Sequence, residues 1–189
     1  MKLSVKPGSL MLALVAVAGC NGCNRHNPAG ALDASGAATN AASAQPSLEA
    51  MLPKQPQPKL PTIKVWVGAE ELITEMALTG EQQMTGMMWR TNMPENTAMI
   101  FAHPTPRQAG YWMKNCYVPL SIAYIDTEGV ILEIHDMKPH DTNSVVSAST
   151  NVRFALETPQ GWFQRHNVNP GAVVRTERGT LRDTFFRQR

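Results

Sequence analysis

The sequence predicts an α+β fold that is mainly β: a curled antiparallel or mixed sheet, or a small barrel-like domain, with two short helices. Short apolar runs and apolar–polar alternation, separated by turn residues, predict six or seven strands. The repeated long helical crossover of a doubly wound sheet is missing. All Trp, Tyr and Phe residues and eight of the eleven Met residues lie from residue 62 onward, in about 128 residues, enough for one ordinary core.

The expected strands follow from local patterns. The clearest is a hairpin, in which residues 120–126 and 130–137 flank a turn at 126–129. Prolines are expected to end one buried strand at residue 103. Other strands are expected at residues 63–67, 98–102, 152–157 and 171–176. Residues 72–78 could form a further strand, and residues 111–116 are a strand or the end of one.

Two helices are expected from their start signals. Thr79 and Gln82 form a capping-box pattern, and methionines follow at helical spacing, so residues 80–90 are expected to form a helix with a methionine face. Thr158 is expected to cap a second short helix, because Pro159 suits a first helical position. Trp162, Phe163 and His166 would lie inside that helix.

The amino terminus has the pattern of an export signal. Lys2 and Lys6 precede a short apolar run at residues 10–18, and small residues then lead to Cys20. This end resembles a bacterial lipobox, which predicts a signal peptide over residues 1–19 and lipidation of Cys20. The alternative is an ordinary signal peptide that ends near a cysteine. Lipidation would anchor the chain stably to a membrane in the bacterial cell envelope, with the domain outside the cytoplasm.

Residues 20–61 are expected to form a disordered tether. In residues 21–60, 28 of 40 residues are Ala, Pro, Gly, Ser, Asn, Thr or Gln, a composition that buries little apolar surface. Cys20 and Cys23 have the spacing of a redox motif, but the low-complexity flanks disfavour that reading. The net charge of +2 divides into +3 over residues 1–61, −4 over residues 62–174 and +3 over residues 175–189, and gives no case for nucleic-acid binding. Residues 177–189 are expected to be a solvated basic tail, since chain ends usually are; the alternatives are that they pack on the domain or touch anionic lipid.

Several segments resemble those of the DUF192 family, a domain of unknown function. They are residues 86–90 (GMMWR), 98–101 (AMIF), 111–116 (YWMKNC), 118–126 (VPLSIAYID), 155–157 (ALE) and 161–162 (GW). The resemblance implies a compact, mainly β domain over residues 62–176, and it implies no established activity or cofactor. Cys116 stands where the family usually has Thr, and Ser121 where it usually has Asp.

The segment Trp112–Asn115 is the main candidate for a binding site. On a strand, Trp112, Lys114 and Cys116 would share one face. In a pocket, Lys114 would attract an anion, Asn115 would give directed hydrogen bonds and Trp112 would form a flat wall. The structural alternative pairs Lys114 with Glu157 or Asp136, uses Asn115 to close a turn and places Trp112 in the core.

Arg90 and Glu157 complete the candidate ligand-binding set. Arg90 is expected to end the first helix, where a cation complements the helix dipole, or to join Lys114 in holding an anion. Glu157 is expected either as a site carboxylate or as an ion-pair partner of Arg90 or Lys114.

The sequence leaves the activity open. The leading hypothesis is a membrane-tethered envelope domain, without catalysis, that binds a small polar ligand, a glycan or a protein partner; no cofactor or metal is expected. The alternative is a hydrolase or transferase that uses Lys114 with Glu157 or Asp136. A second alternative is a soft-metal site for copper, because imidazole, thioether and thiol ligands suit Cu(I); its ligands would be His135, Met137, His140 and Cys116, near Asp136 and Asp141.

Overall fold

The computed structural model describes residues 47–187. The helices are α1 (Leu48–Met51), α2 (Gly80–Thr85), α3 (Trp162–Arg165) and α4 (Leu181–Phe186). The strands are β1 (Thr62–Val67), β2 (Glu70–Ala77), β3 (Thr97–Arg107), β4 (Gly110–Tyr111), β5 (Leu120–Ile125), β6 (Ile131–Met137), β7 (Val145–Val146), β8 (Val152–Pro159), β9 (Val174–Thr176) and β10 (Gly179–Thr180).

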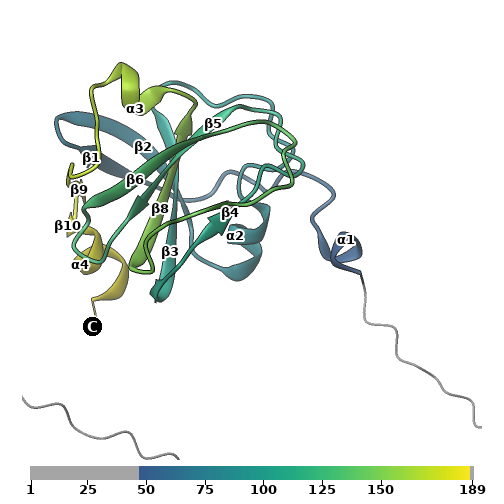
Figure 1. Cartoon of the computed structure of the whole chain (residues 1–189), viewed down its shortest axis with the longest axis horizontal. Helices are drawn as coiled ribbons and strands as arrows, with labels where there is room; N and C mark the ends of the chain where they lie inside the picture. The colour runs from purple at the N-terminus through teal and green to yellow at the C-terminus, as the bar shows by residue number, and fades with distance from the viewer. Residues whose placement is uncertain (1–46, 188–189) are drawn as a thin grey trace, which may run out of the picture. The chain divides into compact units, whose positions relative to one another are not determined.

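Eight strands form one mixed sheet in the order β10-β9-β1-β2-β3-β8-β5-β6 (Figure 1). Only the β2–β3 pair is parallel, and α2 lies in the connection between these two strands. Strands β4 and β7 form a separate two-stranded sheet. The expected mainly β fold with a curled, mixed sheet is confirmed.

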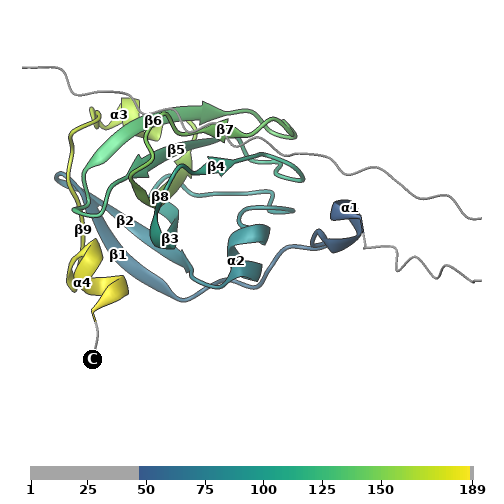
Figure 2. The same ribbon diagram turned by 60° about the horizontal axis from the view of Figure 1, so that its bottom comes forward.

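The sheet curls strongly without closing, so that β1 and β2 face β5 and β6 across the interior (Figure 2). At one end the two sides are joined by an isolated bridge between Val130 and Val173. Gly129 makes this approach possible: its φ is 87°, and a Cβ there would lie 2.7 Å from the carbonyl oxygen of Val174.

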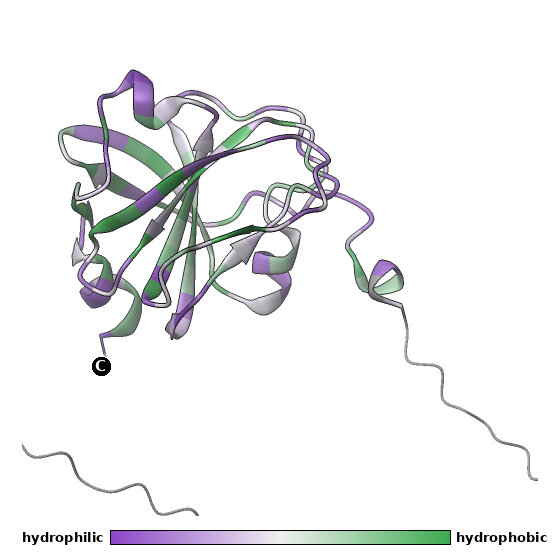
Figure 3. Cartoon of the chain, viewed as in Figure 1, coloured by the Kyte–Doolittle hydropathy of each residue, from purple (hydrophilic) through white to green (hydrophobic). Residues whose placement is uncertain are grey.

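The core occupies both faces of the central strands. Every residue of β5 is buried, and so are six of the eight residues of β8. Both strands are rich in apolar residues, although β8 also contains Arg153, Glu157 and Thr158 (Figure 3). Within residues 47–187, the buried apolar residues form two clusters, one of which includes the residues around β4 and α2.

The two helices predicted from the sequence, which correspond to α2 and α3, begin or end at other residues than expected. The first has the predicted capping box, but it ends at Thr85 because Gly86, at φ 44°, leaves the helical conformation. The second begins at Trp162, after Gly161 in the left-handed conformation. Thr158 does not cap this helix, because it lies in β8 opposite Ser121 of β5.

The expected strand at residues 111–116 is wrong beyond Tyr111. Residues 112–116 turn instead of extending, and Asn115 has a φ of 59°, in the left-handed region. Trp112, Lys114 and Cys116 therefore do not share the face of a strand.

The basic tail is part of the domain, contrary to the expectation that the fold ends at residue 176. Residues 179–186 form β10 and α4, and the side chain of Leu181 is fully buried. Phe185 and Phe186 pack against the same apolar cluster, and the Arg153 guanidinium lies 3.7 Å from the ring centroid of Phe186. The basic composition of residues 177–189 favoured a solvated tail, but Leu181, Phe185 and Phe186 give α4 an apolar side that packs on the domain.

The expected tether also joins the domain over its last part. We call residues 52–60 the N-terminal strap. Leu52 and Leu60 are buried, and Trp89 donates its indole N–H to the carbonyl oxygen of Pro53 at 2.9 Å. The prediction of disorder is therefore wrong for the strap. The predicted signal peptide, Cys20 and the rest of the tether up to residue 46 lie outside the described residues, and none of the helices in residues 47–187 has the length and apolar character to cross a bilayer.

Candidate ligand-binding cavity

A cavity of about 270 Å³ opens between α2, β3, β4 and β8. We call it the Glu157 cavity. Its lining combines apolar, aromatic and sulfur-containing side chains with a small number of polar groups. The lining residues are Gln83, Met84, Thr85, Gly86, Met87, Met88, Phe101, His103, Arg107, Gly110, Tyr111, Trp112, Cys116 and Glu157.

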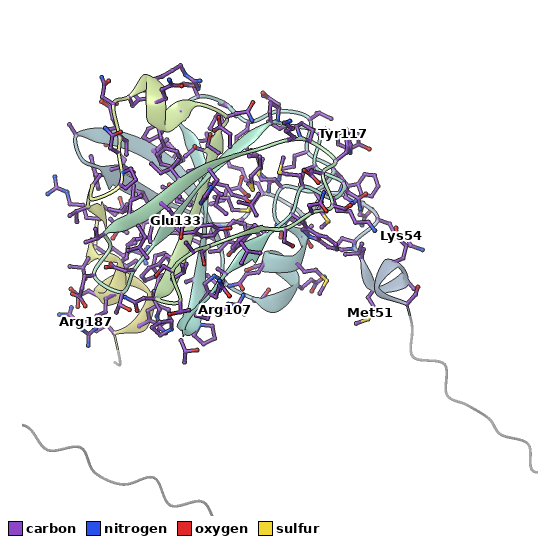
Figure 4. The ribbon with its side chains drawn as sticks, viewed as in Figure 1. Met51, Lys54, Arg107, Tyr117, Glu133 and Arg187 are labelled. Atoms are coloured by element: carbon purple, nitrogen blue, oxygen red, sulfur yellow. The ribbon has the colours of Figure 1, made fainter. Side chains whose placement is uncertain are left out.

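Strand β3 supplies three of these residues. Phe101 and His103 are two residues apart, which places them on one face of the strand, whereas Arg107 follows a register shift between Ala102 and Arg107. Phe101 and His103 are buried, whereas Arg107 is exposed at the end of β3 (Figure 4). The wall of the cavity formed by β3 thus passes from an apolar, buried part to a cationic, solvent-exposed part.

Glu157 is the buried polar group of the cavity. It lies opposite Met99 of β3 and Ile122 of β5, and only 4% of its surface is exposed. Its Oε2 atom has no hydrogen-bond partner within residues 47–187. Burial raises the pKa of Glu157 to about 8, since the low-polarity surroundings disfavour the charged form. At neutral pH the carboxyl group is therefore mainly protonated.

His103 and Tyr111 form a second polar feature beside it. The Tyr111 hydroxyl and His103 Nε2 are 3.2 Å apart. Burial, assisted by Arg107 and Arg153, lowers the pKa of His103 to about 4. Burial and the nearby Glu157 raise the pKa of Tyr111 well above its ordinary value. The pair is therefore neutral across the physiological pH range.

The remaining wall is apolar and aromatic. Met87 and Met88 are almost fully buried, and the Phe101 and Tyr111 rings meet edge to face with centroids 5.0 Å apart. Burial, followed by the effect of Glu157, raises the pKa of the Cys116 thiol to about 12, so this side chain stays a thiol and adds to the apolar wall. The arrangement is suited to an apolar body with one buried polar contact.

Only two of the five residues predicted as ligand-binding line this cavity: Trp112 and Glu157. Arg90 is bound instead to Glu75, with Nη1–Oε1 at 2.5 Å and Nη2–Oε2 at 2.8 Å. It lies five residues beyond the end of α2, so it neither ends that helix nor pairs with Glu157.

Lys114 and Asn115 have other partners. The Lys114 ammonium group binds Glu49, and it lies 5.7 Å from the centroid of the Trp112 ring. Asn115 uses its backbone carbonyl to accept a hydrogen bond from the Trp89 N–H at 2.7 Å. Neither side chain lines the Glu157 cavity.

Several other groups named for the two alternative activities have contacts elsewhere. Asp136 accepts a hydrogen bond from the Ser121 hydroxyl. Among the residues named for a copper site, His135 lies 2.8 Å from Glu133 and the His140 ring packs on Tyr117. Residues 47–187 hold no group of three or more His, Cys, Asp or Glu side chains placed to bind a metal ion.

Sequence reasoning missed His103, Arg107 and Tyr111 as cavity residues. Pro104 and Pro106 were expected to end the strand at residue 103, but β3 continues to Arg107 through a register shift between Ala102 and Arg107. Prolines are tolerated at such irregularities. The available signal was the two-residue spacing of Phe101 and His103; the register shift hides Arg107 from such a pattern.

Three comparisons place the chain among known proteins. A family model described as "DUF192: Uncharacterized ACR" matches residues 63–176. No curated protein matches the chain. The chain is similar to a Sinorhizobium meliloti structure named "putative transcription regulator", with 28% identity, a TM-score of 0.60 and coverage of 64% of this chain and 97% of that one. It is also similar to a Novosphingobium aromaticivorans protein of unknown function, with 28% identity, a TM-score of 0.58 and coverage of 61% and 85%.

Proposed function

We propose that this chain, which belongs to the DUF192 family, binds a small ligand in the Glu157 cavity. One observation carries the proposal: a buried carboxyl group lines the cavity and leaves Oε2 without a partner. Buried polar atoms almost always have hydrogen-bond partners. Oε2 itself is enclosed by protein, but the Glu157 carboxyl group as a whole lines the cavity, so a ligand there can supply a hydrogen bond to this carboxyl group. The aromatic and thioether walls would hold the apolar part of that ligand.

The cavity supports binding better than catalysis. A hydrolase or transferase that pairs Lys114 with Glu157 or Asp136 needs these groups within hydrogen-bond reach. Lys114 binds Glu49 and Asp136 binds Ser121, so each is engaged elsewhere. The thiol of Cys116 has a pKa of about 12, so almost none of it is thiolate at neutral pH. Such a thiol needs a base beside it to act as a nucleophile.

The ligand-binding domain would act from a membrane in the bacterial cell envelope. This part of the proposal rests on the lipobox-like residues that end at Cys20 and on the apolar run before them. Two or three acyl chains on Cys20 would hold the chain firmly. Replacing Cys20 with Ala should move the protein from the membrane fraction to the soluble fraction; unchanged membrane retention would contradict lipidation.

A ligand screen tests the binding proposal. The full chain is screened by thermal shift against amines, alcohols, sugars, organic acids and nucleotides, alongside the variants Glu157→Gln and Lys114→Ala. We expect compounds that raise the Tm of the wild type and of Lys114→Ala and have a lost or weakened effect on Glu157→Gln. Hits that depend on Lys114 and are indifferent to Glu157 would place the site elsewhere and refute the proposal.

A further inference from the structure

The charge of the Glu157 cavity is unbalanced at its buried part. Burial alone sets the raised pKa of Glu157, and no cationic group compensates the carboxyl. Arg107 lines the same cavity, but its charge acts on His103 and Tyr111, toward the exposed end of β3. A cation placed beside Glu157 would therefore stabilise the carboxylate form of this group without competition from another cation there.

Four of the other polar lining groups are already paired: Gln83, Thr85, and the His103–Tyr111 pair. Gln83 donates to the carbonyl oxygens of Ala77 and Ala102 at 3.2 and 3.0 Å. Thr85 donates its hydroxyl to the Glu81 carbonyl at 2.8 Å. A sugar would bring several hydroxyl groups into a cavity that has few free partners for them, and each unpaired buried hydroxyl is costly. The lining favours a ligand with one polar head.

We propose that the cavity takes a small primary amine in its ammonium form, with the ammonium group hydrogen-bonded to Glu157 and an apolar body against Phe101, Trp112 and the methionines. This inference rests on the proposed function and names its ligand class. Aromatic faces attract a cation, and methionine fits irregular apolar shapes, so both kinds of wall suit an alkylammonium ion. The cavity volume of about 270 Å³ suits a small ligand.

Binding of an ammonium ion must release a proton from Glu157. The free carboxyl is about nine-tenths protonated at pH 7, and the ion pair requires the carboxylate. The titratable groups facing Glu157 are Tyr111 on β4, Tyr124 on β5 and the Cys116 thiol, and burial moves the pKa of each upward, Cys116 to about 12. The pKa of His103 is about 4. Among these groups, Glu157 alone changes charge between pH 6 and pH 8.

Isothermal titration calorimetry of the full chain tests the inference with two probes of matched size, n-pentylamine and 1-pentanol. Measurements at pH 7 in phosphate and in MOPS buffer, neither of which is a primary amine, give the number of protons released. We expect n-pentylamine to release about 0.9 proton per molecule bound and to bind about 50-fold more tightly at pH 8 than at pH 6, as the ionised fraction of Glu157 rises. The Glu157→Gln variant should lose amine binding.

The outcomes separate the ligand class from the existence of the site. Binding of 1-pentanol alone, or amine binding without proton release, would overturn the amine inference and leave the cavity as a ligand site. Failure of both probes would overturn the amine inference as well, and the wider ligand screen would then decide the proposed function independently. Proton release is measured on the wild type, so the test stands even if Glu157→Gln folds poorly.

Discussion

Arg90 and Glu75 form a bidentate ion pair beneath the N-terminal strap. Two hydrogen bonds join the guanidinium to the carboxylate, and Glu75 Oε2 also accepts the backbone N–H of Leu60 at 2.7 Å. Burial acts to raise the pKa of Glu75, but the hydrogen bonds from Arg90 and Leu60 outweigh it and hold this pKa below its ordinary value. Arg90 therefore helps to fix the strap to the domain.

Replacing Arg90 with Ala should lower the free energy of unfolding by about 2–3 kcal/mol, because it leaves a half-buried carboxylate without its cation. Arg165→Ala is the matched control, since Arg165 makes a similar bidentate pair with Glu95 on the exposed surface. Its loss should be below about 1 kcal/mol. Urea unfolding at pH 7 gives both values, and equal losses would show that burial does not strengthen the Arg90 pair.

The stability of the chain should fall with rising pH because of Glu157. Its pKa is about 8 in the folded chain against an ordinary 4.5, so the folded state holds a proton that the unfolded state has lost. Between pH 5 and pH 8 this group alone should lower the free energy of unfolding by about 3 kcal/mol. Glu157→Gln removes the effect, so the difference between variant and wild type should grow in favour of the variant from pH 5 to pH 8.

Urea unfolding at pH 5, 6.5 and 8 measures this difference, and other titrating groups cancel because both proteins contain them. A difference that stays constant with pH would mean that Glu157 ionises normally.

The N-terminal strap should contribute measurably to stability. Leu60→Ala should cost about 2 kcal/mol, because Leu60 is 8% exposed and packs in the cluster near α2. Leu78→Ala serves as the control, since Leu78 is 49% exposed. Thermal unfolding of the full-length variants compares the two. A strap that is merely a spacer would give the same small change for both.

The carboxyl-terminal helix α4 should behave as core. Leu181 is fully buried, so Leu181→Ala is expected to lower the free energy of unfolding by about 3 kcal/mol. Val173→Ala removes apolar atoms from a side chain that is 54% exposed and should change stability by less than about 1 kcal/mol. Chemical denaturation distinguishes them, and a negligible effect of Leu181→Ala would restore the solvated-tail interpretation.

Most of the sheet could be predicted from local pattern because its strands are short apolar runs between turns. The hairpin of β5 and β6 is the clearest case, since both strands and the turn at residues 126–129 have their own local signals. The two ends of the folded domain, the N-terminal strap and α4, could not be predicted in the same way. Leu60 and Leu181 are single apolar residues in polar surroundings, and only contacts with distant segments bury them.

The site was predictable only in part for a similar reason. Glu157 was predicted as a site residue because it is a charged residue at the end of a strand. Trp112 was predicted because it is an aromatic residue in a polar segment. Lys114 looked equally suitable, but its partner Glu49 is 65 residues away along the chain, in α1. His103 was missed because the prolines after it suggested the end of a strand that in fact continues.

The central claim is that a protonated carboxyl group lies unpartnered in the cavity and receives the ligand. Carbon-13 NMR of the glutamate side chains over pH 4 to 10, with the Glu157 signal assigned by its loss in Glu157→Gln, tests it most directly. We predict a midpoint near pH 8 in the free chain and a lower midpoint in the presence of n-pentylamine. A midpoint near pH 4.5, unchanged by the amine and by every compound that stabilises the chain, would contradict it.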